Sequence, residues 1–242
     1  MRRTALLGLA GLLFAGITLG EDFWVKKDFT QWTDEEVRRI MTNSPWSKET
    51  TVNAPAAEFG SRGPERSAAP VDVDTNGGGG GGGRGGRGRR GGGDDASSTL
   101  TQAQITLTVS WRSALPLRKA VVKNRIGASS EVPADLQQSL SKEPEDYIVV
   151  VTGVPAAMAR KIQDPVRLNR SSLKVGKRAP IVPKSVDFQA RTQSVDVLFI
   201  FPKNEPITLE DKEAELDLLL GPMEAKKKFT LKDMLYNGKL EM

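Results

Sequence analysis

Alternating and continuous runs of apolar residues along the chain predict several β-strands. In residues 102–111 (QAQITLTVSW), an apolar side chain at every second position alternates with Thr or Ser, the pattern of a strand with one buried face. Residues 147–153 (YIVVVTG) and 195–201 (VDVLFIF) are almost continuously apolar, which predicts central strands buried on both faces. Residues 49–53 and 185–189 are predicted to form two further strands.

Near the end of the chain, two alternating segments predict an antiparallel hairpin. Residues 213–219 and 223–231 flank Gly221 and Pro222, and glycine in the first position of a two-residue turn is typical of type II′. This turn sets a register with two pairs of opposite charge on one face: Glu215 with Lys228, and Asp217 with Lys226. The apolar side chains then share the other face, as in a half-buried hairpin.

Short helices are predicted mainly in the first half of the chain. The TDEE sequence at residues 33–36 is a capping box, and NSP at residues 43–45 ends the helix that it begins. Further helices are predicted at residues 116–125, 133–140 and 155–162. Because the strands gather later in the chain, we expect an α+β fold with a mostly antiparallel sheet and a few short helices.

A low-complexity segment interrupts the predicted sheet. Residues 77–93 contain only Gly and Arg, and residues 54–98 as a whole contain too few apolar side chains to offset the entropy of ordering, so they are predicted to be disordered. The strands on either side are predicted to pair, which makes this segment an insertion in a hairpin. Residues 21–53 are then expected to dock on a main body formed by residues 99–242.

The first twenty residues have the form of a secretory signal peptide. Arg2 and Arg3 precede an apolar-to-small run over residues 4–19, and polar sequence begins directly after Gly20. The run is short for a membrane span, which needs about 20 apolar residues. We therefore expect an exported, soluble protein, periplasmic or extracellular, cleaved after Gly20. An uncleaved anchor is the alternative.

Three of the four tryptophans lie close together in the N-terminal region. Trp24, Trp32 and Trp46 allow two interpretations: a platform for a ligand such as a sugar, or large anchors that dock a short helix on the main body. We favour docking, because a region of this size cannot build a core of its own.

The chain contains no Cys and no His, which excludes several chemistries. A disulfide framework, a Cys nucleophile, a Cys/His zinc site and an imidazole base are all ruled out. Asp72, Asp74 and Asn76 match the first half of a calcium loop, but Gly83 stands where the bidentate Glu is required. We therefore expect no metal site and no cofactor.

Parts of the chain resemble a group of exported bacterial proteins of unassigned activity. The resemblance lies in SPW at residues 44–46, the Gly/Arg-rich insertion, and the pattern W-x-S-A-x-P at residues 111–116 followed by Arg118. It covers about 30 residues plus the insertion. It implies the same order of parts and supplies no catalytic residues.

Basic residues are concentrated in one stretch of the main body. The net charge is +5, yet residues 96–204 hold 16 Lys and Arg against 8 Asp and Glu. We expect this stretch to bind a polyanion, such as an acidic polysaccharide or an envelope surface with lipid headgroups, or else to balance acidic residues elsewhere on the surface. The candidate residues are Arg160, Lys161, Arg167, Arg170, Lys174, Lys177, Arg178, Lys184 and Arg191. Nucleic acid is an unlikely ligand, because Phe188 is the only aromatic residue between Arg160 and Arg191.

Two enzymatic patterns remain possible without His or Cys: paired carboxylates and a Ser/Lys pair. Glu205, Glu210, Asp211 and Glu213 form the densest acidic set, and two carboxylates could carry out glycoside hydrolysis. A Ser/Lys pair would need Ser171 or Ser172 to meet Lys174. Neither pattern is specific, so we expect no catalytic residues and a structural or binding module of the cell envelope or exterior. The alternative is a carboxylate-dependent, glycosidase-like hydrolase.

Deleting residues 77–93 should leave the melting temperature nearly unchanged, because doubling the length of a loop costs only about 0.6 kcal/mol of closure entropy. Thermal unfolding of the full chain and of the deletion variant, followed by circular dichroism, measures this. A melting temperature lower by many degrees would show that the segment takes part in the folded structure.

Overall fold

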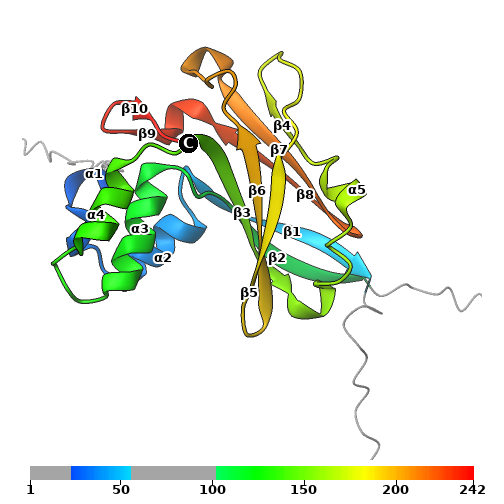
Figure 1. Ribbon diagram of the computed structural model, residues 1–242, viewed down its shortest axis with the longest axis horizontal. Coiled ribbons are helices and arrows are strands. Elements are labelled where there is room, and N and C mark those ends of the chain that lie inside the picture. The colour runs from blue at the N-terminus through cyan, green and yellow to red at the C-terminus, as the bar shows by residue number, and fades with distance from the viewer. Residues whose placement is uncertain (1–22, 56–101) are drawn as a thin grey trace, which may run out of the picture.

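The computed structural model describes residues 23–55 and 102–242 and has an α+β fold, as predicted (Figure 1). Helices α1 to α4 gather on one side of the molecule and two antiparallel sheets form the other. The predicted signal peptide, the calcium-loop half-motif and the Gly/Arg-rich residues lie outside the described residues.

The larger sheet has five antiparallel strands in the order β1-β2-β3-β6-β5. Their bounds are Ser47–Pro55 (β1), Gln102–Trp111 (β2), Asp146–Pro155 (β3), Ser185–Ala190 (β5) and Ser194–Pro202 (β6). β3 and β6, which are the two continuous apolar runs, have a neighbour on both sides. The prediction that these runs form central strands is therefore confirmed.

The strands before and after the Gly/Arg-rich segment pair with each other, as predicted. Ser47 is opposite Ser110 at one end of the β1–β2 pair, and Pro55 is opposite Gln102 at the other. Ala54 is buried within β1. The strand continues to residue 55, two residues beyond its predicted end at residue 53, and its alternating burial continues to the same point.

The smaller sheet contains the C-terminal hairpin in the predicted register. β7 (Glu213–Leu220) pairs with β8 (Met223–Thr230), with Glu215 opposite Lys228 and Asp217 opposite Lys226. Both pairs have N–O distances of 3.7 Å. The short strand β4 (Ser172–Val175), which the sequence did not reveal, adds to the free edge of β7.

Most of the predicted helices are present, and one is absent. α2 (Asp34–Thr42) has the predicted capping box, and α3 (Leu115–Ile126) and α4 (Ala134–Ser141) match within about one residue. The other helices are single turns: α1 (Phe23–Lys26), α5 (Pro165–Leu168), and 3₁₀ turns at Phe29–Gln31, Ala156–Met158, Leu209–Asp211 and Leu231–Met234. The prediction of a helix over residues 155–162 is wrong. β3 extends to Pro155, a 3₁₀ turn covers Ala156–Met158, and residues 159–163 form turns.

The two sheets meet at an aromatic contact inside the core. Trp111 of β2 packs edge-to-face on Phe229 of β8, with ring centroids 5.8 Å apart, and both side chains are fully buried. The N-terminal region docks on this body through Trp46, whose indole N–H donates to the carbonyl of Glu241 at 3.0 Å. Trp24 and Trp32 are also buried. The tryptophans therefore anchor the region and do not form an exposed platform.

Replacing Gly221 with alanine should destabilise the fold because the turn of the β7–β8 hairpin has no room for a side chain. Gly221 has a φ of +59°, and a Cβ there would lie 2.5 Å from the carbonyl oxygen of Lys161. Gly127 has a φ of +60° with nothing within 4 Å, so Gly127→Ala is a matched control. We expect a loss of about 1–2 kcal/mol for the control and about 2–4 kcal/mol for Gly221→Ala. Urea unfolding of both variants measures the difference, and equal losses would contradict the close approach.

Candidate functional site

The structure does not bring the nine predicted basic residues together on one unpaired surface. Arg160, Lys161, Arg167 and Arg170 lie on the β3–β4 connection, which we define as residues 156–171. The other five, Lys174, Lys177, Arg178, Lys184 and Arg191, lie on β4, just after it, and at the two ends of β5.

Arg178 is held in a cluster with two of the predicted carboxylates. Its guanidinium pairs with Asp211 at 2.8 Å and with Glu205 at 3.8 Å, and it donates to the carbonyl of Pro206. Asp211 also accepts the backbone N–H of Thr208 in a capping box. This cluster fastens the loop before β7 to the end of β4, so Arg178 has a structural role.

Lys184 and Arg191 are paired as well. Lys184 lies 2.7 Å from Asp146, across the start of β3, and Arg191 lies 2.8 Å from the buried carboxylate of Asp196 on β6. Lys174 stands opposite Glu215 in the β4–β7 register. For these residues the structure agrees with the interpretation that surface charges balance one another.

The β3–β4 connection is different, because its anchors are apolar and its cations face outward. Ile162 and Leu168 are buried, and the hydroxyl oxygen of Ser171 accepts the backbone N–H of Leu219 on β7 at 2.9 Å. These anchors leave Arg167 and Arg170 exposed. Within the described residues, no ion pair is found for four of the exposed cations: Arg160, Arg167, Arg170 and Lys177.

The predicted carboxylate set does not form an isolated acidic pair. Beyond Glu205 and Asp211, Glu213 pairs with Lys228 at 3.0 Å. A hydrogen bond with Thr208 lowers the pKa of Glu210 from its ordinary value. A general acid requires the opposite, a raised pKa in an apolar environment. Ser171 is fully buried while Lys174 is exposed, so these two residues do not form a Ser/Lys pair. No hydrogen bond joins Ser172 to Lys174 among the described residues.

Two other carboxylates meet in a pocket that the sequence did not indicate. Glu143 and Glu241 both lie within 4 Å of the Lys239 ammonium, beside a pocket of about 300 Å³. The same pocket contains Tyr147, whose hydroxyl oxygen accepts the buried N–H of Ile207 and whose pKa is raised by burial. Glu143 and Glu241 are almost a hundred residues apart, so no local pattern connects them.

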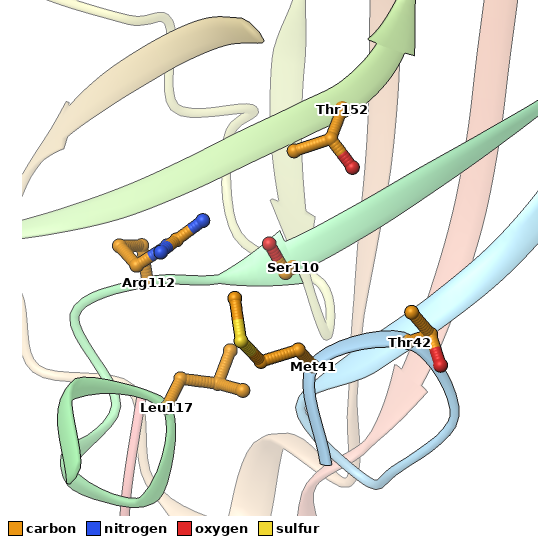
Figure 2. Close-up of a pocket in the computed structure, with 6 residues that line it drawn as sticks. All are labelled: Met41, Thr42, Ser110, Arg112, Leu117 and Thr152. Carbon is orange, nitrogen blue, oxygen red and sulfur yellow. The ribbon is translucent and has the colours of Figure 1, made fainter. Parts of the chain in front are cut away.

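A smaller pocket lies where the helices meet the larger sheet, on the face of the sheet away from the core (Figure 2). Met41 of α2 and Leu117 of α3 point toward each other and form its apolar wall. Ser110 of β2, Thr152 of β3 and Arg112, directly after β2, lie across from them. The pocket also includes Thr42 and has a volume of about 100 Å³.

Strand alternation explains why this pocket is polar on one side. Trp111 points into the core, so Ser110 and Arg112 must both point to the opposite face. Thr152 reaches the same face because it is opposite Thr108 on β2. The helices cover this end of the face and leave Arg112 partly buried.

The guanidinium of Arg112 has lost much of its water. Burial lowers its pKa from the ordinary value, the nearby carboxylate of Asp196 acts in the opposite direction, and the charge of Arg191 adds to the lowering. Asp196 is itself bound by Arg191, whose Nε and terminal nitrogen both lie 2.8 Å from its Oδ2. Among the described residues, none accepts a hydrogen bond from the side chain of Arg112.

The described residues contain no group of three or more Asp, Glu, His or Cys placed to hold a metal ion. Within residues 23–55 and 102–242, no helix is both long and apolar enough to cross a membrane.

Comparison with known proteins adds no relative. No protein-family model matches the chain, and no curated protein or solved structure matches it either. The resemblance to exported bacterial proteins therefore stays a prediction, and the function must be argued from the side chains themselves.

Proposed function

We propose that the protein is an exported, non-catalytic binding module that holds an anionic polysaccharide through the exposed arginines of the β3–β4 connection. One observation supports this proposal: the basic residues between Arg160 and Arg191 fall into two groups that differ in whether the described residues supply an acidic partner. Arg178, Lys184 and Arg191 are neutralised by acidic partners, whereas Arg160, Arg167 and Arg170 are exposed on one short connection, without an ion pair among the described residues.

The local charge of the connection supports this role. It carries four basic residues against a single acidic one, Asp164, which is already used to cap α5 by accepting the N–H of Val166. Arginine binds carboxylate and sulfate groups through two parallel hydrogen bonds, which suits a chain of regularly spaced anions.

The surroundings favour a polysaccharide over the other polyanions. Val166 is 72% exposed, but it is a single small side chain on a one-turn helix, too little apolar surface to enter a membrane. Phe188 packs against the core and offers no stacking surface to nucleic-acid bases. Support for a binding role over the hydrolase alternative comes from the ion pairs that occupy Glu205, Asp211 and Glu213.

The mature chain should bind polygalacturonate and dextran sulfate at about 50 mM salt and release them near 0.5 M, where the Debye length falls to about 4 Å. Replacing Arg160, Arg167 and Arg170 together with Gln should weaken binding roughly tenfold, because exposed ion pairs contribute about 0.5 kcal/mol each. Affinity chromatography and calorimetry in a salt series measure both effects.

A matched control variant has the same total charge as the variant with three substitutions in the β3–β4 connection. The triple variant Arg38→Gln, Arg125→Gln and Lys232→Gln removes three exposed cations elsewhere on the surface and should retain nearly full affinity. Equal losses in the two triple variants, or binding that does not depend on salt, would overturn the proposal. So would binding to phosphatidylglycerol vesicles without binding to either polysaccharide, an outcome that would point to a lipid surface.

A further inference from the structure

The pocket lined by Arg112, Ser110 and Thr152 contains the positively charged guanidinium of Arg112, for which the described residues supply no hydrogen-bond acceptor. A guanidinium has five N–H donors, and here none is taken by a described side chain or carbonyl. Leaving a partly buried charge unpaired is unfavourable, and protein structures usually supply a partner.

The charges around the pocket leave a place for one negative charge. Arg112 and Arg191 both lie close to Asp196, which gives two positive charges and one negative charge at this point. Asp196 is 6% exposed and is bound through its Oδ2 by Arg191, and no ion pair joins it to Arg112 among the described residues. A bound monoanion would bring the three groups to neutrality.

The shape and lining of the pocket select the kind of anion. A volume of about 100 Å³ corresponds to roughly three water molecules, enough for a carboxylate group and a short substituent. The hydroxyl of Ser110 already donates to the carbonyl of Val150, whereas the Thr152 hydroxyl has no described acceptor. Met41 and Leu117 close the opposite side, and their apolar surface strengthens any ion pair by keeping water away.

We propose that this pocket binds a small monocarboxylate, or the carboxylate end of a larger molecule, with Arg112 donating two parallel hydrogen bonds and Thr152 donating a third. Figure 2 shows Arg112 and Thr152 on the sheet side and Met41 and Leu117 on the helix side. The methyl group of Thr152 faces Arg112 there, so its hydroxyl reaches a bound anion through a change of χ1 rotamer. The inference is independent of the polysaccharide surface, which lies on the β3–β4 connection and uses other arginines.

The test compares acetate with chloride at equal pH and equal ionic strength. Sodium acetate at about 50 mM should raise the melting temperature of the full chain by about 2–4 °C over sodium chloride, the shift for a site with a Kd of about 10 mM. In Arg112→Met this difference should disappear. The variant itself should melt no lower than the wild type in chloride, because the group that it removes is unpaired.

Arg118 provides a matched control. It is also a partly buried arginine, but its guanidinium donates to the carbonyls of Ser139 and Lys142. Arg118→Met should therefore lower the melting temperature in chloride and keep the full additional stabilisation by acetate. The two arginine variants are thus expected to behave in opposite ways.

Thr152→Val keeps the shape of the side chain and removes the donor, so acetate affinity should fall about fivefold while the fold is retained. NMR titration of the arginine Nε–Hε signals provides a reading on the wild type alone: acetate should shift one signal, which is absent from Arg112→Met. An equal effect of chloride, an acetate effect that survives in Arg112→Met, or no acetate effect on the wild type would each overturn the proposal.

Discussion

The contact between Trp111 and Phe229 is the constraint on which the rest of the structure depends. It joins the larger sheet to the smaller one in a protein that has no disulfide to do so. A large aromatic pair of this kind contributes by its buried area and by its edge-to-face geometry. Because strand residues alternate between faces, placing Trp111 in the core also fixes where Ser110 and Arg112 point. The same residue thus determines both the core and the pocket behind it.

Electrostatics in this protein are organised by local pairing. The basic pI suggests a uniformly cationic surface, but several of the cations face carboxylates across neighbouring strands or loops. The arginines of the β3–β4 connection and Arg112 differ from these paired cations, because none of them has an ion pair among the described residues. On the β3–β4 connection, Ile162 and Leu168 are buried in the core, whereas Arg160, Arg167 and Arg170 are exposed. At Arg112 the helices remove water, while Arg191 has already taken the nearest carboxylate.

Local patterns predicted the elements whose structure depends on neighbouring residues. The capping box at Thr33, the β7–β8 hairpin with its charge pairs, and the central strands were all readable, because caps, tight turns and alternation act over a few residues. The prediction of a helix at residues 155–162 was wrong because the structure of this segment depends on residues far away in the sequence. Its apolar residues serve contacts with distant segments: the backbone at Lys161 and Ile162 lies against Gly221. Strand β4 is similarly determined by the free edge of β7.

The same distinction between local patterns and distant contacts applies to the candidate sites. Sequence alone determined the fold class, the pairing of the strands on either side of the Gly/Arg-rich segment, the exclusion of Cys and His chemistry, and the stretch in which basic residues are concentrated. Tertiary structure decided which of those basic residues are neutralised, that the tryptophans are anchors, and that Arg112 lies among Met41, Leu117 and Thr152 with no hydrogen-bond partner in the described part of the chain. These side chains come from α2, α3 and β3, separated by up to about a hundred residues. Composition and periodicity describe each segment by itself, and the charge that a site leaves unpaired appears only when the segments are packed together.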